Sequence, residues 1–235
     1  MDGWAGLFSG GKDSSYAVHL ARERGLPVTR LVTVHPPEDA FLYHVPGTHL
    51  AALAAESMDI PLVEVDAADA VSAAGAADST ARGDAELEPL ESALAKLTDD
   101  GLSGISVGAV ESDFQHRRIG AMAGRLGLDV FAPLWRRDPV ALLTEMIDAG
   151  FTIEVVAVAA RGLDESWLGR TIDAAAVSEL VTLRDDYGVH PIGEGGEFET
   201  LVTDGPHMAR PLQFDATPDW DGTRGHLQFE DAWLE

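Results

Sequence analysis

Three scarcities bound what this 235-residue chain can do: it has no cysteine, only two lysines and no long apolar run. Without cysteine there are no disulfides, no thiol relay for sulfur transfer and no thiol that could release ammonia from glutamine. No apolar stretch reaches the roughly 18 residues of a membrane helix, and the N-terminus lacks the basic and apolar regions of a signal peptide. We therefore expect a soluble, cytoplasmic protein that has no membrane partner.

Basic residues are few beside the acids. Asp and Glu number 40 against 16 Lys and Arg, which gives a formal net charge of −24. Such a surplus with almost no lysine is typical of a halophilic protein, because dense carboxylates hold water and salt screens their repulsion. A basic partner attracted by the acidic surface is the alternative. One of the two lysines, Lys12, lies in a glycine-rich segment, which indicates a function for it.

The first part of the chain alternates apolar runs with amphipathic stretches, as strands and helices do in a parallel sheet. We expect strands at residues 4–8, 28–34, 62–65, 105–107 and 130–131, and helices at residues 13–24, 47–58, 87–97 and 113–126. Residues 67–83 are rich in alanine and glycine and are expected to form a mobile surface connection. Residues 1–132 are therefore predicted to be an α/β domain.

The pattern changes after Pro133. A helix is expected at residues 138–149, a strand at residues 151–159, a helix at residues 173–183, and further strands near Leu201, near Gln213 and at residues 226–229. This order predicts a second, smaller α+β domain over residues 133–235.

Residues 9–14 read Ser-Gly-Gly-Lys-Asp-Ser and lie between an apolar run and a helical segment. Gly10 and Gly11 can adopt backbone conformations closed to other residues, so successive N–H groups can point into one concavity. Lys12 adds a positive charge, and the following helix presents its N-terminal donors to the same place. The segment is therefore predicted to bind the pyrophosphate end of ATP. Its proposed ligands are Ser9, Gly10, Gly11, Lys12, Asp13 and Ser14.

Two other interpretations of this segment are weaker. Residues 6–12 match the first seven positions of the Walker A pattern, but Asp13 stands where that pattern needs Ser or Thr to hold magnesium. A plain glycine turn does not require lysine, aspartate and serine together. The segment instead resembles the pyrophosphate loop of ATP-pyrophosphatases, which cleave ATP between the α- and β-phosphates and adenylate their substrate.

A second informative cluster is Gly-Glu-Gly-Gly-Glu-Phe-Glu-Thr at residues 193–200. Three glycines and three carboxylates in one short segment are poor core material. If the chain is extended after Gly196, Glu197 and Glu199 share one face and could hold a cation or the positive group of a substrate. An acidic turn in an acidic protein is the alternative.

Three weaker signals remain open. Residues 162–170 follow an expected strand, where α/β proteins place ligands, but they could equally cap a helix and pack a tryptophan. Arg117 and Arg118 could face phosphate or carboxylate, or pair with nearby acids. His44 and His49 lack a third ligand at matching spacing, so we expect no zinc site.

Taken together, the motifs at residues 9–14, 162–170 and 193–200 resemble the diphthine-ammonia ligase family over nearly the whole chain and in the same order. Ala-Val-Glu-Ser-Asp-Phe-Gln at residues 109–115 and Pro-Leu-Trp-Arg-Arg-Asp at residues 133–138 add to this resemblance. One departure is His116, which stands where arginine is common and leaves the role of that position open. The resemblance implies a HUP-type parallel-sheet nucleotide-binding domain, of the adenine nucleotide alpha hydrolase kind, followed by a substrate domain.

The resemblance also implies an activity. The expected enzyme amidates diphthine, a modified histidine of translation elongation factor 2, with ammonium and ATP. It gives diphthamide, AMP and pyrophosphate through an acyl-adenylate, with Mg²⁺ as cofactor. The absence of cysteine agrees with free ammonium as the nitrogen source, although a separate glutaminase subunit stays open.

The implied roles fall on the motifs. Lys12 and Asp13 are expected to be catalytic, Asp13 also to help hold Mg²⁺, and Glu194, Glu197 and Glu199 to face diphthine or ammonium. The expected substrate residues are Asp164, Glu165, Trp167, Arg170, Gly195, Gly196, Phe198 and Thr200. Trp167 or Phe198 would receive the trimethylammonium group of diphthine by cation–π contact. Thr33, at the end of an expected strand, is placed on the adenine side from topology alone.

Two other functions compete with this one. An ATP-pyrophosphatase that modifies tRNA would need a basic groove, but basic residues are sparse and scattered, so we expect no nucleic-acid partner. A non-catalytic sensor of adenine nucleotides would need the phosphate loop but not segment 193–200 with its glycines and carboxylates. The sequence leaves the docking surface and the oligomeric state open, with a homodimer among the alternatives.

Overall fold

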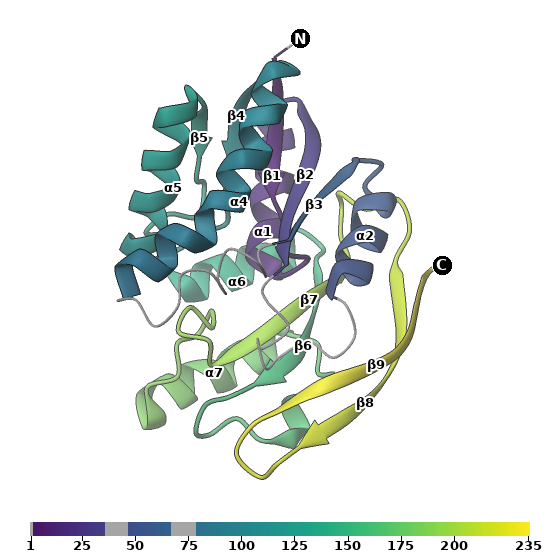
Figure 1. The fold of residues 1–235 in the computed structure, drawn as a ribbon. Helices are drawn as coiled ribbons and strands as arrows, with labels where there is room; N and C mark the ends of the chain where they lie inside the picture. Colours follow the sequence, from purple (N-terminus) through teal and green to yellow (C-terminus); the bar gives the residue numbers. More distant parts are fainter. Residues whose placement is uncertain (1, 36–46, 67–78) are drawn as a thin grey trace.

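The computed structural model describes residues 2–35, 47–66 and 79–235, which form two sheets with flanking helices (Figure 1). The first sheet has five strands in the order β3-β2-β1-β4-β5, and every neighbouring pair is parallel. The second has four strands in the order β7-β6-β9-β8, and its pairs are antiparallel. This confirms the predicted α/β fold with a further α+β unit.

The elements of the first unit lie close to their predicted ranges. They are β1 (Gly3–Leu7), α1 (Lys12–Glu23), β2 (Val28–His35), α2 (Gly47–Ser57), β3 (Leu62–Asp66), α4 (Ser79–Asp99), β4 (Leu102–Ser106), α5 (Asp113–Leu126) and β5 (Asp129–Phe131). One prediction is wrong: residues 79–83 begin α4 instead of continuing a surface connection. Ala81 and Arg82 favour a helix, and Gly83 is tolerated within it. Residues 67–78 lie outside the described residues.

The second unit follows β5. It contains α6 (Pro139–Asp148), β6 (Thr152–Val158), the short helix η1 (Glu165–Trp167), α7 (Ala174–Tyr187), β7 (Phe198–Asp204), β8 (Leu212–Trp220) and β9 (Gly225–Leu234). Asp138 and Asp173 cap α6 and α7. The side chain of each accepts a 2.8 Å hydrogen bond from the backbone N–H of the residue three positions later in the chain. The predicted boundary between residues 132 and 133 falls in the connection between β5 and α6 and stays a prediction.

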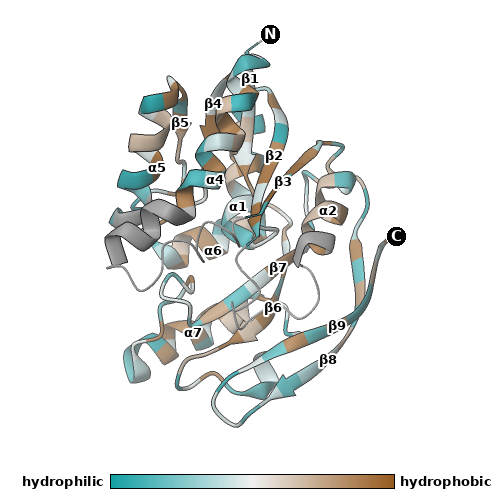
Figure 2. Cartoon of the chain, viewed as in Figure 1, coloured by the Kyte–Doolittle hydropathy of each residue, from teal (hydrophilic) through white to brown (hydrophobic). Residues whose placement is uncertain are grey.

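Helices cover both faces of the parallel sheet. α4 and α5 bury Leu94 and Met122 against Ile105 of β4 on one face. On the other face, α1 and α2 pack on β2, with Val18 against Leu31. Hydrophobic residues accordingly run along the strands of this sheet, as the brown segments of Figure 2 show. Among the described residues no helix is both long and apolar enough to cross a membrane.

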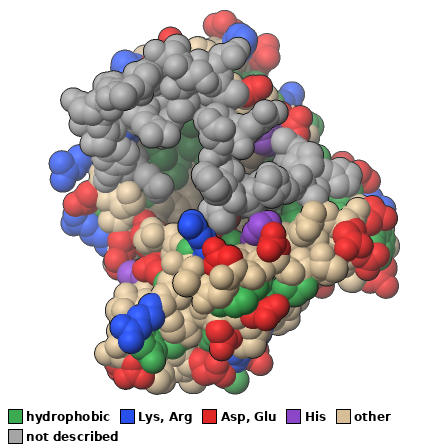
Figure 3. Space-filling view, turned by 60° about the horizontal axis from the view of Figure 1, so that its bottom comes forward, with side chains coloured by type: hydrophobic (Ala, Val, Ile, Leu, Met, Phe, Trp, Pro, Cys, Tyr) green, Lys and Arg blue, Asp and Glu red, His purple; other side chains and the backbone are tan. Residues whose placement is uncertain are grey.

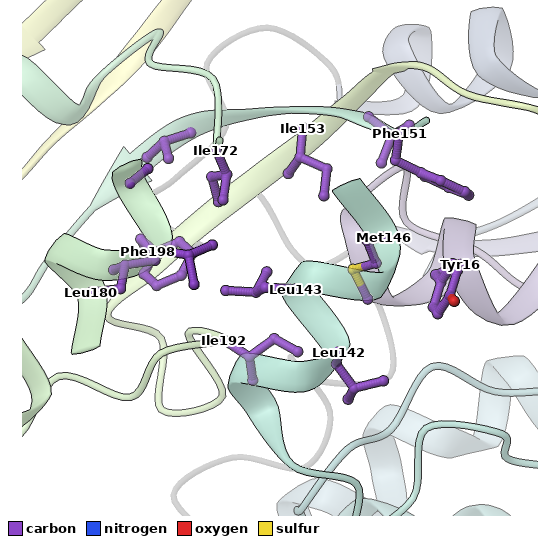
Figure 4. Close-up of a cluster of buried hydrophobic side chains, with 14 of the residues drawn as sticks. Tyr16, Leu142, Leu143, Met146, Phe151, Ile153, Ile172, Leu180, Ile192 and Phe198 are labelled. Atoms are coloured by element: carbon purple, nitrogen blue, oxygen red, sulfur yellow. The ribbon is translucent and has the colours of Figure 1, made fainter. Parts of the chain in front are cut away.

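A second core joins the two units. Tyr16 of α1 belongs to the same buried cluster as Leu142, Leu143 and Met146 of α6 and Ile153 of β6, and Figure 4 shows these side chains converging. The three α6 residues are fully buried. α1 therefore packs on the parallel sheet and also on the second unit, so the loop that precedes α1 lies where the two units meet.

The strand order fixes where a ligand can bind. The chain builds β1, β2 and β3 in one direction and then returns to place β4 on the other side of β1. A crevice forms outside the carboxyl ends of strands at such a reversal, and α/β proteins place their ligands there. The segments that follow β1 and β4 are therefore brought together at this crevice.

Candidate active site

A cavity of about 630 Å³ lies at the carboxyl ends of β1, β2 and β4. The described residues that line it are Leu7, Phe8, Ser9, Asp13, Ser14, Val32, Thr33, Val34, Leu87, Leu90, Val107, Gly108, Ala109, Ser112, Arg118, Ile119, Gly193 and Glu194. Figure 3, in which the bottom of Figure 1 is turned forward, shows a hollow with hydrophobic side chains in its depth. The cavity therefore combines an apolar wall with a few polar groups, as nucleotide sites do.

The phosphate loop of residues 9–14 forms one wall. Gly10 has a positive φ of 82°, which L side chains rarely adopt. The Ser14 hydroxyl donates to the carbonyl of Gly11 at 3.0 Å and accepts from the Ser9 N–H at 3.2 Å. The loop is thus closed on itself while it leads into the N-terminus of α1, where N–H groups can receive an anion.

Lys12 is almost completely buried, with 4% of its surface exposed. Its Nζ lies 2.9 Å from Asp13 Oδ2 and 5.5 Å from the centre of the Phe198 ring. The other carboxylate oxygen, Asp13 Oδ1, is buried and has no hydrogen-bond partner among the described residues. One free carboxylate oxygen beside a phosphate site fits Mg²⁺, which is usually held by one or two carboxylates and the substrate phosphates.

The described residues contain no group of three or more His, Asp or Glu side chains that could hold a metal ion by themselves. A magnesium ion at Asp13 would thus depend on the nucleotide for its other ligands. Of the two histidines considered for zinc, His44 and the side chain of His49 lie outside the described residues.

Strand β7 of the second unit pins the phosphate loop. The Lys12 N–H donates to the Thr200 hydroxyl at 3.2 Å, and the Val202 N–H donates to the Gly10 carbonyl at 3.0 Å. A Cβ on Gly11 would lie 3.3 Å from the Thr200 carbonyl oxygen, so the two segments are in close contact. Thr200, predicted to bind substrate, here contacts the loop.

The segment after β4 forms the opposite wall. Gly108 lies so close to α1 that a Cβ there would be 2.6 Å from the Asp13 carbonyl carbon. Ala109 and Ser112 continue this wall toward α5. The sequence predicted a helix over residues 113–126, but Gly108 and Ala109 were not among the predicted site residues. The sequence offered two signals there, a glycine directly after an expected strand and the motif at residues 109–115.

Two carboxylates of segment 193–200 accept hydrogen bonds from backbone N–H groups. Glu194 Oε1 accepts from Glu111 at 3.1 Å and from Ser112 at 2.9 Å, across the cavity wall. Glu197 folds back on its own loop, where Oε1 accepts from His190 at 3.1 Å and Oε2 from Gly195 at 2.8 Å.

Glu199 is half-buried in β7 between Phe198 and Thr200. Exposed Gly195 and Gly196 form the turn before that strand, in which Gly196 has a φ of 80°. The structure thus brings the segment that carries the predicted acceptor-side carboxylates next to the phosphate loop.

Residues 162–170 form a compact turn that does not contribute to the cavity lining given above. Asp164 accepts from the N–H of Ser166 at 3.0 Å and from its hydroxyl, and these bonds lower the pKa of Asp164. Glu165 is exposed on η1.

Trp167 is buried in the shared core, and the Arg170 guanidinium covers its ring at 4.4 Å. Arg170 also makes a bidentate pair with Glu179 at 2.6 and 2.7 Å, which raises the pKa of Arg170. The predicted substrate roles of these residues stay predictions.

Thr33 lines the cavity beside Val32 and Val34, where topology predicted the adenine side. Arg118 also lines the cavity, whereas Arg117 is exposed and lies 3.7 Å from Asp113. The role of His116 was left open by the sequence. In the structure its ring stacks on Trp135, with ring centres 4.0 Å apart and an angle of 11° between the planes.

Comparison with protein families gives two matches. A family model described as the diphthamide synthase N-terminal domain matches residues 3–130, and one described as the diphthamide synthase C-terminal domain matches residues 138–234. Together they cover most of the chain and both sheets. They confirm the resemblance inferred from the motifs.

Curated relatives agree. A protein of Danio rerio named diphthine–ammonia ligase is 35% identical over 221 residues, which cover 90% of this chain and 86% of the relative. A protein of Homo sapiens with the same name is 34% identical and covers 91% of this chain and 83% of the relative.

One solved structure, of a predicted subunit of tRNA methyltransferase from Methanocaldococcus jannaschii, covers 88% of this chain and 98% of that chain. Its identity of 18% and TM-score of 0.47 make the likeness too distant to bear on function.

Proposed function

This chain belongs to the diphthamide synthase family, and on that premise we propose that it amidates diphthine on translation elongation factor 2 with ammonium, at the expense of ATP. The products are diphthamide, AMP and pyrophosphate. The observation that carries the proposal is the Ser-Gly-Gly-Lys-Asp-Ser loop at the strand-order reversal, pinned by the segment that the family resemblance assigned to the acceptor.

The chemistry needs an activated carboxylate, because a free carboxylate is a poor acyl donor. One oxygen of the diphthine carboxylate attacks the α-phosphorus, and the bond to the oxygen that bridges to the β-phosphorus breaks. Ammonia then attacks the acyl carbon, the bond to the phosphate oxygen breaks, and AMP leaves. The ammonium ion loses one proton to become the nucleophile and a second after attack.

Lys12 and the loop N–H groups act on the leaving pyrophosphate. Their donors lie at the N-terminus of α1, so the charge that develops on the departing oxygen meets a fixed positive environment. Asp13 Oδ1 would hold Mg²⁺ together with the nucleotide phosphates, and the ion would neutralise part of their charge. Thr33 and its apolar neighbours would contact the adenosine.

The acceptor side is assigned to segments 162–170 and 193–200. Glu199, next to the residues that touch the phosphate loop, is proposed to face ammonium. The rings of Trp167 and Phe198 already have Arg170 and Lys12 at 4.4 and 5.5 Å. A trimethylammonium group would use either ring only where it replaces that cation.

A direct assay tests this function. The protein is incubated with ATP, magnesium, ammonium and elongation factor 2 that carries diphthine. We expect AMP and pyrophosphate in step with a carboxylate-to-amide mass change on the acceptor, and neither product when a chelator removes magnesium. Production of ADP, or AMP formed only when tRNA replaces the elongation factor, would contradict the proposal. Nucleotide binding without turnover would favour a sensor.

A further inference from the structure

Glu194 joins the loop before β7 to the cavity wall that follows β4. It lies on the loop that leads into β7, and its Oε1 accepts the N–H groups of Glu111 and Ser112 at 3.1 and 2.9 Å. These two donors directly precede α5, which begins at Asp113. Donors at the start of a helix have no partner within it, so an oxygen that accepts two of them stabilises the local backbone.

The loop that presents Glu194 is held by other bonds. Glu197 binds the backbone of His190 and Gly195 with its two oxygens. A second contact joins the same loop to the turn after β4: His190 Nε2 lies 3.2 Å from Glu111 Oε2. The carboxylate of Glu194 is therefore presented from a loop with a defined shape.

The same segment then reaches the phosphate loop. A few residues after Glu194, Thr200 accepts from the Lys12 N–H, and Val202 donates to the Gly10 carbonyl. Residues 190–202 thus touch the turn after β4 on one side and the turn after β1 on the other. Residues of both turns line the cavity.

We infer that Glu194 is a positioning residue: by accepting from Glu111 and Ser112 it holds the turn after β4 at the spacing that ATP requires. It acts through an oxygen acceptor of the right reach, and its negative charge is not required. This inference rests on the proposed function and deepens it, because it gives Glu194 a task on the nucleotide side and not at the ammonium.

Four variants distinguish the effect of the length of the Glu194 side chain from the effect of its charge. E194Q keeps one acceptor oxygen at the same distance, and that single oxygen takes both bonds in the structure. E194A removes the acceptor, and E194D keeps the charge but is one methylene shorter. E230A, an exposed residue of β9, is the matched control for loss of an acid.

We expect E194A and E194D to raise the KM for ATP roughly tenfold, with kcat changed less than about threefold, because the two backbone N–H groups lose an acceptor oxygen within reach. E194Q should keep the KM for ATP within about twofold of the wild type because it retains the acceptor oxygen, and E230A should leave both KM and kcat within about twofold. Calorimetric binding of a non-hydrolysable ATP analogue, measured without acceptor or ammonium, should rank the variants in the same order. Thermal unfolding identifies any variant that fails to fold.

Two results would overturn the inference. One is E194Q as defective as E194A although it folds, which would mean that the charge acts on substrate. The other is unchanged analogue binding in E194D and E194A. If E194A alone does not fold, the comparison of E194D with E194Q still decides. If the wild type makes no diphthamide but analogue binding follows the expected order, the proposed function fails and the inference stands.

Discussion

A buried lysine stands at the proposed nucleotide site. Lys12 is 4% exposed, pairs with Asp13 at 2.9 Å and lies over Phe198. Burying an ammonium group without full compensation is unfavourable, so the fold tolerates it only with a paired acid and polar contacts. Arriving phosphates would supply further negative charge at the same point.

The first prediction concerns this lysine. K12A should lower kcat/KM for AMP formation by about 10²- to 10³-fold, because a donor to the leaving group is lost from a buried site. The other lysine provides the control: K96A on α4 should behave as the wild type. A K12A enzyme within about threefold of the wild type in single-turnover assays would show that the loop amides suffice.

Gly108 gives a second prediction at the residue scale. A Cβ there would lie 2.6 Å from the Asp13 carbonyl carbon and 2.7 Å from the Ser14 nitrogen, so G108A must displace backbone. We expect it to lose about 1–3 kcal/mol of stability and to weaken binding of an ATP analogue at least tenfold.

G120A is the control for G108A. Gly120 is within α5 and has open space around the added methyl, so its substitution should stabilise the protein by up to about 1 kcal/mol. Urea unfolding and calorimetry measure both effects. A G108A protein with wild-type affinity would show that the turn after β4 can move without consequence.

At the scale of elements, α1 meets the second unit through a cluster of aromatic rings. Phe151, just before β6, stacks on His207 with ring centres 4.8 Å apart and meets Tyr16 edge-on at 5.4 Å. Burial lowers the pKa of His207 to about 3 and also lowers that of His19. Both imidazoles are therefore favoured in the neutral form at this junction.

The third prediction follows from that pKa. The unfolded state binds a proton at His207 near pH 6.5, whereas the folded state does so only near pH 3. The contribution of His207 to the free energy of unfolding is therefore fully present above about pH 7. It decreases as the pH falls from about 6.5 toward 3, by up to about 1.4 kcal/mol per pH unit. H207F keeps a ring against Phe151 and should flatten this slope. Urea unfolding at several pH values measures it, and equal slopes in the two proteins would contradict the assignment.

The sequence predicted elements well where the pattern was local. The bounds of α5 were predicted exactly as found because an acidic start, an apolar stripe and a glycine after Leu126 mark them. β8 and β9 are much longer than expected because their outer faces are polar and do not show a clear apolar alternation. The start of α4 was missed because alanine-rich sequence is also typical of connections.

The site was predictable only in part. Ser9 to Ser14 could be predicted to bind phosphate because the pattern lies in consecutive residues, and the structure places Ser9, Asp13 and Ser14 in the cavity lining. The bonds that Glu194 accepts from Glu111 and Ser112 join positions 83 and 82 residues apart, and no local pattern encodes them. Glu197 was expected to share a face with Glu199, but β7 begins after it and its carboxylate turns back on the loop.

At the scale of the whole molecule, the main feature is the large excess of negative charge. The net charge is −24, and Figure 3 shows acidic side chains spread over the face that it presents. Like charges at this density repel each other in the compact state, and the repulsion is screened over about 10 Å at 0.1 M salt and about 3 Å at 1 M. The fold is therefore expected to be weakest in dilute buffer.

A fourth prediction concerns the dependence of thermal stability on salt concentration. The midpoint of thermal unfolding should rise steadily as KCl is increased from about 0.05 M to about 1 M, with most of the gain where the screening length falls below the spacing of surface charges. Differential scanning calorimetry at constant pH measures it. A midpoint that stays level or falls would mean that paired charges outweigh the excess of acids.

Thr200 and Val202 belong to strand β7 of the antiparallel sheet, and both also form hydrogen bonds with the phosphate loop. A rotation of that sheet would therefore carry Gly10 and Lys12 with it. If the elongation factor docks on the second unit, thermodynamic linkage requires that nucleotide and protein alter each other's affinity by the same factor. Binding of the macromolecular substrate would then change the affinity for nucleotide before any phosphoanhydride bond is broken.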